Sequence, residues 1–224
     1  MDIDLCIFNL DGVIADTARF HYFTWKELAL KFDFDLSPEY YEKIKGLDRI
    51  ESLRQIMSWA NIEKEEKEIQ NIAKLKNEHY IQMIQMLHPS EIKPGVKAFL
   101  TELKKLHIKT AIGTASKNAV TILDKLGLTN QFDTIVDGFQ LDNCTPVPHL
   151  YLKCCSELKA DPAHSVVFED ATNGITAAKS AGFFTIGIGK PGSLNLADAV
   201  ISNFRGFNYS QLLNILSGKF SQII

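Results

Sequence analysis

The chain has 224 residues, of which 46% are hydrophobic, so it is long enough for an α/β domain with a smaller insert and a buried core. Its 24 basic and 27 acidic side chains give a net charge of −3 and form no block of one sign, which argues against a nucleic-acid partner and an anionic membrane surface. A small soluble ligand is the better expectation.

The four cysteines have no metal-ligand spacing, and two of them, Cys154 and Cys155, are adjacent. This pattern favours reduced, buried thiols over a disulfide framework. The chain starts with Met-Asp-Ile-Asp, which lacks the basic segment of a targeting peptide, and no apolar run approaches the roughly 20 residues that span a bilayer. We therefore expect a cytoplasmic protein that does not contact a membrane.

The stretch 5–17 begins with an apolar run that two polar residues, Asn9 and Asp11, interrupt just before Gly12. Such a run is typical of a buried parallel strand. Because side chains repeat with period two, Asn9 and Asp11 leave the strand on the same side, and Gly12 lets the chain turn away. Open α/β sheets place their functional sites at these carboxyl ends, so we expect the site here.

Residues 16–92 show helical periodicity and no convincing strand. Apolar side chains recur at three- and four-residue steps from residue 21 to residue 32, which predicts an amphipathic helix. Ser37 and Pro38 provide a cap and a first helical residue for a second helix, and residues 49–60 and 63–86 predict two more. We therefore predict a cap domain of four helices, residues 16–92, inserted behind the first strand.

From residue 93 onward, short apolar strands alternate with helices. The predicted strands are residues 109–113, 134–136, 165–168, 185–188 and an edge strand at 199–201, and the predicted helices are residues 96–106, 119–126, 150–158, 174–181 and 209–216. This alternation predicts a parallel sheet with right-handed crossovers. The fold class is therefore α/β, with a Rossmann-like parallel-sheet core made of residues 1–15 and 93–224.

Two later strands also end in polar residues. The second strand runs into residues 113–118, which offer hydroxyls and free backbone amides ahead of a helix and so predict an anion site; alternatively, Thr114 and Ser116 merely cap that helix. The strand at 165–168 ends in Glu169 and Asp170, which alternatively begin a helix. Adjacent carboxylates at a buried strand end repel one another and lose hydration, so we expect them to hold Mg²⁺.

These strand ends resemble the motifs of the haloacid-dehalogenase-like phosphohydrolases, and the resemblance implies roles for particular residues. It places the nucleophile, normally Asp, at Asn9 and the general acid and base at Asp11. It implies phosphate contacts from Thr114, Ala115 and the residue at position 145, where Thr145 replaces the family's Lys. It also implies that Mg²⁺ is bound by Asn9, Asp11, Glu169 and Asp170.

The cap residues extend the resemblance to the β-phosphoglucomutase branch of that superfamily, over essentially the whole chain. The substrate-binding residues that it implies are Thr17, His21, Trp25, Gly46, Leu47, Arg49, Ser52, Lys76, Ser116, Lys117 and Asn118. Arg49 would grip the distal phosphate of a bisphosphate intermediate, because a guanidinium matches phosphate oxygens in bidentate geometry. His21 and Lys76 would orient the sugar and the general acid. Taken singly, His21 and Trp25 are more typical of the core of an amphipathic helix than of a binding site.

The sequence departs from the family pattern where the chemistry takes place. Asn9 lacks the charge and basicity of a nucleophilic carboxylate, and removing a nucleophile lowers turnover by roughly 10⁶ in an unrelated hydrolase. The third motif, Lys-Pro-x-Pro-Asp in the family, begins with Thr145 and ends with His149 here. Lys117 and Lys153 are the candidates to replace the missing ammonium.

We therefore expect a β-phosphoglucomutase-like protein that binds a hexose phosphate and Mg²⁺, with catalysis absent or severely impaired by Asn9 and Thr145. The alternative is an active β-phosphoglucomutase or sugar phosphatase that interconverts β-glucose 1-phosphate and glucose 6-phosphate, in which the change at Asn9 is compensated or engineered. We expect a monomer.

Overall fold

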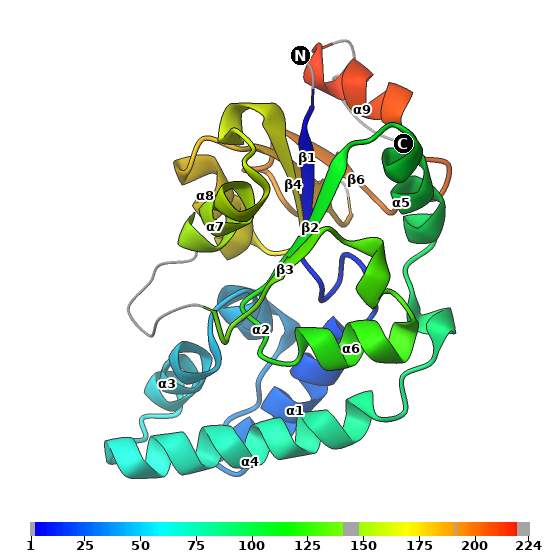
Figure 1. The fold of residues 1–224 in the computed structure, drawn as a ribbon. Helices are drawn as coiled ribbons and strands as arrows, with labels where there is room; N and C mark the ends of the chain where they lie inside the picture. Colours follow the sequence, from blue (N-terminus) through cyan, green and yellow to red (C-terminus); the bar gives the residue numbers. More distant parts are fainter. Residues whose placement is uncertain (1–2, 141–147, 191, 219–224) are drawn as a thin grey trace.

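Strand β1 (Leu5–Phe8) lies in the middle of a six-stranded sheet in the computed structural model, which describes residues 3–140, 148–190 and 192–218. The other strands are β2 (Lys109–Gly113), β3 (Thr134–Val136), β4 (Ser165–Glu169), β5 (Phe184–Ile188) and β6 (Ala199–Ile201). Their order is β3-β2-β1-β4-β5-β6, and every neighbouring pair is parallel (Figure 1). The predicted α/β fold with a parallel sheet is confirmed.

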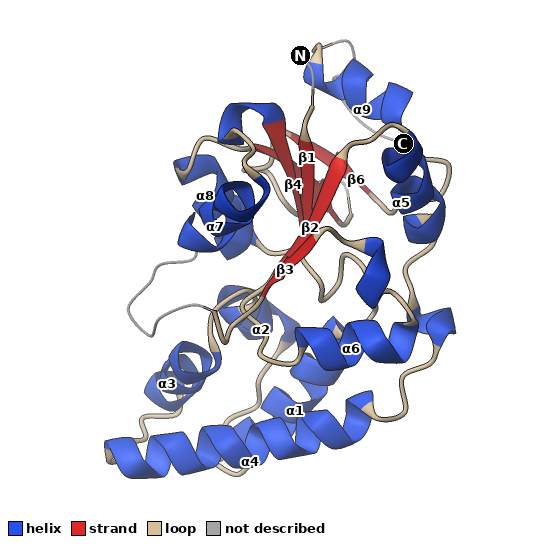
Figure 2. Ribbon diagram, viewed as in Figure 1, coloured by secondary structure: helices blue, strands red, loops and turns tan. Residues whose placement is uncertain are grey.

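Both faces of this sheet are covered by helices, as Figure 2 shows. Because side chains alternate along β1, Leu5 and Ile7 pack on the face covered by α7 (Pro148–Leu158) and α8 (Thr172–Ser180), whereas Cys6 and Phe8 pack on the opposite face. The helices on that second face are α5 (Val96–Lys105), α6 (Ala119–Leu126) and α9 (Tyr209–Leu216). Both faces are apolar, which explains the unbroken hydrophobic run in the strand.

The segment after β1 forms four helices, which Figure 1 shows below the sheet: α1 (Ala18–Leu30), α2 (Pro38–Ile44), α3 (Arg49–Trp59) and α4 (Glu66–Ile84). Side chains that precede them cap two of the helices: the Ser37 hydroxyl accepts from the Tyr40 amide, and the Asp48 carboxylate accepts from the Ile50 amide. The helices enclose an apolar cluster of their own, which includes Trp25, Ala29, Leu36, Ile44, Leu53, Ile56, Met57, Ile69 and Ala73. The predicted helical insert is present.

The two chain segments that join these helices to the sheet lie side by side. Ala15 and Ile92 form an antiparallel bridge, and the Lys93 amide donates to the Ile14 carbonyl at 2.9 Å. The Asp16 amide donates to the Glu91 carbonyl at 3.0 Å. The division into a core of residues 1–15 and 93–224 and a cap of residues 16–92 stays a prediction, and its two boundaries meet at this bridge.

In the described residues, three short 3₁₀ helices were not predicted from the sequence: η1 (Pro89–Glu91), η2 (Thr129–Gln131) and η3 (Pro162–His164). A turn of three residues is too short to show a periodic pattern, so apolar spacing could not predict it. No helix within the described parts of the chain is both long and apolar enough to cross a membrane.

The return into the core passes through Gly95, which precedes α5 with a left-handed backbone, φ +86°. A Cβ there would lie 1.9 Å from the Phe204 carbonyl oxygen. We expect Gly95→Ala to lower the free energy of unfolding by about 3 kcal/mol or more, because the strain of the left-handed backbone adds to overpacking. Gly127 is also left-handed, at φ +67°, but has no atom within 4 Å of such a Cβ.

The matched control is therefore Gly127→Ala, for which we expect about 1 kcal/mol from backbone strain alone. Urea denaturation of the parent and both variants measures the two losses. Equal losses would show that the contact with Phe204 contributes nothing.

Candidate active site

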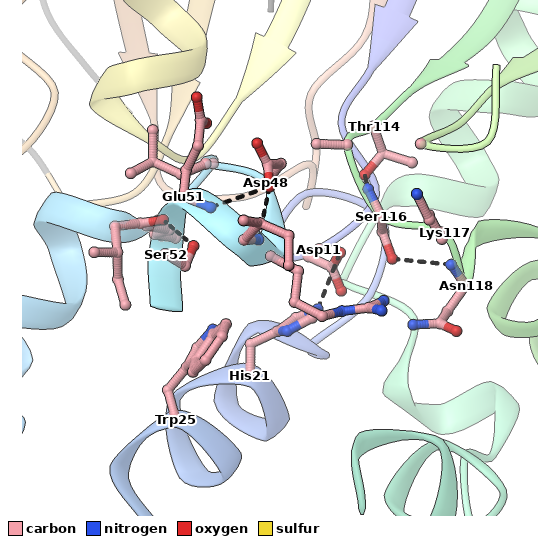
Figure 3. A pocket seen from close by; sticks show the side chains of 18 of the residues that line it. Asp11, His21, Trp25, Asp48, Glu51, Ser52, Thr114, Ser116, Lys117 and Asn118 are labelled. Carbon is pink, nitrogen blue, oxygen red and sulfur yellow. Dashed lines mark hydrogen bonds and ion pairs between the residues drawn. The ribbon is translucent and has the colours of Figure 1, made fainter. Parts of the chain in front are cut away.

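A cavity of about 1030 Å³ lies between the carboxyl ends of the strands and the cap helices. The predicted site residues on its wall are Asn9, Asp11, His21, Trp25, Gly46, Leu47, Arg49, Ser52, Lys76, Thr114, Ala115, Ser116, Lys117, Asn118, Glu169 and Asp170. Figure 3 shows labelled side chains entering this space from α1, from α3 and from the loop after β2. Thr17 is fully buried behind the wall, and Thr145 lies outside the described residues.

Asn9 directly follows β1, and both ends of its amide are hydrogen-bonded. Its Nδ2 donates to Glu169 Oε1 at 2.8 Å, and its Oδ1 accepts from the Leu10 amide at 2.8 Å. A carboxylate at position 9 would lose the bond to Glu169 and repel it instead. The amide is therefore the side chain that suits this position when no cation lies between the two groups.

Glu169 ends β4 and is almost completely buried. Besides Asn9, its Oε1 accepts from the backbone amides of Asp170 and Ala171 at 2.7 and 3.0 Å, and its Oε2 accepts from the Tyr151 hydroxyl at 2.7 Å. Burial and the neighbouring Asp170 carboxylate raise the pKa of Glu169 to about 7, against the effect of these hydrogen bonds. The protein thus already occupies both oxygens of this side chain.

Asp11 is held from the cap side. Its Oδ1 accepts from the Thr17 hydroxyl at 2.5 Å and from the Tyr80 hydroxyl at 3.2 Å. Burial, and to a lesser extent repulsion by Asp170, raise the pKa of Asp11 against these two hydrogen bonds. A carboxyl group that is fixed in place and has a raised pKa suits proton transfer in either direction.

His21 and Lys76 lie next to each other beside Asp11. Lys76 Nζ lies 3.0 Å from His21 Nδ1 and 4.3 Å from the centre of the Trp25 ring, and the His21 ring stacks on Tyr80 with centroids 4.0 Å apart. Burial lowers the pKa of Lys76 well below its usual range; in its protonated form Lys76 only donates, and His21 Nδ1 then accepts and leaves the ring proton on Nε2, 3.8 Å from Asp11 Oδ2. Trp25 and Lys76 are both buried, so Trp25 serves the cap core and the cavity wall together.

The two hydroxyls of the loop after β2 bind within the loop, and the N-cap of α6 is Asn118 without a side-chain cap bond; the anion site stays a prediction. Thr114 Oγ1 accepts from the Ser116 amide and Ser116 Oγ accepts from the Asn118 amide, each at 3.2 Å, so the two hydroxyls shape the turn before α6. All three residues also line the cavity. Asn118 Nδ2 donates to Asn77 Oδ1 at 3.0 Å, which ties this loop to α4 of the cap. The loop is therefore a structured turn that faces the ligand space.

The Asp170 carboxylate lies close against the backbone of Gly12. A Cβ on Gly12 would lie 1.7 Å from Asp170 Oδ2, so only glycine fits here. The ammonium of Lys45, from the cap, lies 2.8 Å from the same oxygen. Two buried carboxylates at this strand end are thus stabilised differently: Glu169 by hydrogen bonds and Asp170 by an ion pair.

A magnesium ion would find one carboxylate in this group that no hydroxyl or amide of a described residue binds, Asp170, together with the neutral amide oxygen of Asn9 and the backbone of Asp11. Mg²⁺ uses one or two carboxylates, water and substrate phosphate, so this donor set fits a weak site. Within the part of the chain that the structure describes, no group of three His, Cys, Asp or Glu side chains is arranged to hold a metal. Direct binding by Glu169 stays a prediction.

The cavity wall also contains cations from the cap. Arg54 pairs with Glu66, whereas Arg49 makes no ion pair with any described residue. Lys117 lies on the wall with its ammonium 5.6 Å from the centre of the Phe139 ring. Arg49 is therefore available for an anion in the cavity.

Sequence reasoning misjudged some neighbours of the site. Lys153, named as a substitute for the missing ammonium, does not line the cavity, and its Nζ donates to the Gln140 carbonyl at 3.0 Å. Lys45 and the Tyr151 hydroxyl were overlooked, although both contact the carboxylates at the end of β4. Lys45 lies in the cap stretch on which the resemblance rests. A single lysine next to a glycine forms no pattern of spacing that would identify it as a site residue.

Together the parallel sheet, the polar strand ends and the helical insert across the cavity define a capped α/β protein. Residues 6–188 match the family model described as haloacid dehalogenase-like hydrolase, and the chain therefore belongs to this family. Among curated proteins, it is 36% identical over 197 residues to a β-phosphoglucomutase of Bacillus subtilis (strain 168), a match that covers 87% of each chain.

Two further comparisons agree with this placement. The chain is 30% identical over 201 residues to a phosphorylated carbohydrates phosphatase of Thermotoga maritima, covering 89% of this chain and 90% of the relative. It resembles the crystal structure of β-phosphoglucomutase from Clostridium difficile with a TM-score of 0.90 and 33% identity, covering 97% of this chain and 98% of that one. The predicted family is confirmed, and its known relatives include mutases and sugar phosphatases.

The environment of His21 predicts a pH dependence of stability. Burial and the positive charges of Lys76 and Arg49 hold the pKa of His21 well below its usual range. The folded chain therefore leaves this ring neutral at a pH where the unfolded chain protonates it, so stability is lost as the pH falls below about 6.5. His21→Gln removes this loss, which reaches up to about 1.4 kcal/mol per pH unit.

Urea denaturation at about pH 7 and about pH 5 measures the difference between parent and variant. His107→Asn is the matched control, because His107 is exposed in the folded chain and is solvated in both states. If His21→Gln keeps the full pH dependence of the parent, the ring is not held neutral.

Proposed function

We propose that this chain binds a hexose phosphate in the cavity between cap and core, at a site of the β-phosphoglucomutase type. The observation that carries the proposal is the presence of two groups in one cavity: the Asp11 carboxyl held by Thr17 and Tyr80, and the guanidinium of Arg49, which forms no ion pair with a described residue. The first can exchange a proton with a sugar hydroxyl, and the second can bind a phosphate. The similarity to mutases and a sugar phosphatase supports this assignment.

Each of these residues has a role in the proposed complex. Arg49 anchors the phosphate that lies far from the strand ends, and the loop of Thr114 and Ser116 receives the phosphate near them. Asp11 holds or releases a proton at its carboxyl oxygen, and Lys76 keeps His21 oriented toward it. A Mg²⁺ ion held by Asp170 would offset the negative charge of the bound phosphate. We also propose a cytoplasmic monomer without nucleic-acid or membrane partners.

Phosphoryl transfer is the reaction of the family, and position 9 limits it in this chain. An amide has neither the charge nor the basicity of the carboxylate that would accept a phosphoryl group, so we propose that transfer by this chain is absent or severely slowed. The second candidate is an active mutase or sugar phosphatase with a compensating group. The intact Asp11, Thr17, His21 and Lys76 arrangement favours it, as do the activities named for the relatives.

Mass spectrometry after incubation with acetyl phosphate and Mg²⁺ separates the two candidates. A gain in mass of one phosphoryl group, lost again on adding β-glucose 1-phosphate, establishes the active reading. An unchanged mass in a chain that still binds glucose 6-phosphate establishes that the chain binds sugar phosphate without accepting a phosphoryl group.

Phosphate anchoring by Arg49 is tested by Arg49→Ala. A hydrogen bond to a charged group contributes about 1.5–3 kcal/mol, so we expect the dissociation constant for glucose 6-phosphate to rise about 10- to 100-fold in calorimetry. Arg205→Ala is the control, since Arg205 is exposed and does not line the cavity. Unchanged affinity in Arg49→Ala would remove Arg49 from the site.

Activity should return only with a double change, Asn9→Asp with Thr145→Lys. Asn9→Asp supplies a nucleophile but places a carboxylate beside Glu169 Oε1, which now accepts from the amide. The lysine offsets the repulsion between the new carboxylate and a phosphate dianion, so the two changes act on one transition state and are not additive. We expect the double variant to be at least about 100-fold faster than either single variant.

The assay is conversion of β-glucose 1-phosphate to glucose 6-phosphate, primed with the bisphosphate, in the parent, both single variants and the double variant. If the parent is as fast as the double variant, position 9 does not limit the reaction. If the double variant is folded, binds sugar phosphate and stays inert, the remaining difference lies at His149 or in the cap.

A further inference from the structure

Lys45 brings a positive charge from the cap to the carboxylates of the core. It follows α2 with an extended backbone, and its Nζ lies 2.8 Å from Asp170 Oδ2 and donates to the Asp170 carbonyl, also at 2.8 Å. Only 16% of the Lys45 side chain and 7% of the Asp170 side chain are exposed. Glu42, in α2, is farther from the ammonium, at 3.9 Å. Asp170 is therefore the main partner of this ammonium.

The backbone on both sides of the contact fixes this position. Asn173 Nδ2 donates to the carbonyls of Lys43 and Lys45, at 3.1 and 3.0 Å. Gly46 approaches the start of α8 so closely that a Cβ would lie 3.2 Å from the Ala171 Cβ. These contacts hold residues 43–46 against α8, so the ammonium reaches Asp170 from a fixed backbone and not from a freely moving side chain.

The remaining side chains at the strand ends have no comparable need for a cation. Glu169 accepts four hydrogen bonds from protein donors, Asn9 is neutral, and Asp11 accepts from Thr17 and Tyr80. Asp170 is thus the carboxylate that a cation would satisfy, and Lys45 already supplies one. A buried carboxylate without such a partner would be costly.

We propose that Lys45 is a tethered cation that competes with the divalent ion for Asp170. The proposal rests on the proposed function, because that function assigns Mg²⁺ to this carboxylate. A divalent ion binds here only by displacing the ammonium, so its apparent affinity is lower than the carboxylate alone would give. By linkage, the bound ion weakens the contact of the cap with α8 by the same factor.

The experiment is a calorimetric titration with MgCl₂, without sugar, of the parent and three variants. Lys45→Met removes the charge and keeps the length of the side chain, and Lys45→Arg keeps the charge. Lys43→Met removes an exposed charge two residues away that does not contact Asp170. Circular dichroism establishes that each variant is folded, and Lys45→Gln replaces the methionine variant if that one is not.

We expect Lys45→Met to bind Mg²⁺ about tenfold more tightly than the parent, the size of a partly buried charge interaction after screening. Lys45→Arg and Lys43→Met should bind it within about twofold of the parent. Equal affinity in Lys45→Met and the parent overturns the competition, as does an equal gain in Lys43→Met or Lys45→Arg.

Two further results separate this proposal from the proposed function. If no variant binds Mg²⁺, both the competition and the metal assignment fail, while binding of glucose 6-phosphate without metal still decides whether the cavity is a sugar-phosphate site. If the sugar phosphate does not bind but Lys45→Met gains affinity for Mg²⁺, the substrate assignment fails and the competition stands.

Discussion

The parallel pairing of β1 with β2 and β4 is the constraint on which the site depends. Phe8 lies opposite Ile112 and Phe168. The backbone N–H of Asn9 continues this pairing by donating to the Phe168 carbonyl at 2.9 Å. In this register, three strands end at one edge and deliver an amide, a hydroxyl loop and two carboxylates within reach of one ligand. A slip of one residue would turn Asn9 toward the opposite face of the sheet.

The regular elements could be predicted from sequence because their signals are local. The strand 109–113 and the helices 119–126 and 209–216 agree with the structure to the residue, since each is an apolar pattern bounded by polar or glycine residues. The strand-end residues of the cavity could be named from the sequence pattern, whereas the cap residues could be named only through the family resemblance. Their contacts could not: the Asn9 amide donates to Glu169 across 160 residues, and no spacing in the chain signals such a pair.

The charges at the strand ends form a consistent set without a metal. The Asn9 amide donates where a carboxylate would repel, and Lys45 neutralises the carboxylate that has no hydrogen-bond donors of its own. In the described residues, no buried side-chain nitrogen or oxygen is left without a hydrogen bond. Because Asn9 and Lys45 belong to the same set of charges, the effect of a substitution at one of them depends on the side chain at the other.

The bridge between Ala15 and Ile92 gives the cap a pivot. Both segments that join the helices to the sheet meet there, so a rigid rotation of the helices against the sheet would have a single axis, and displacement would grow with distance from it. Thr17 is two residues from the bridge, so such a rotation would displace its bond to Asp11 only a little. The bond that holds Asp11 would therefore persist under such a rotation, while contacts farther from the bridge would change.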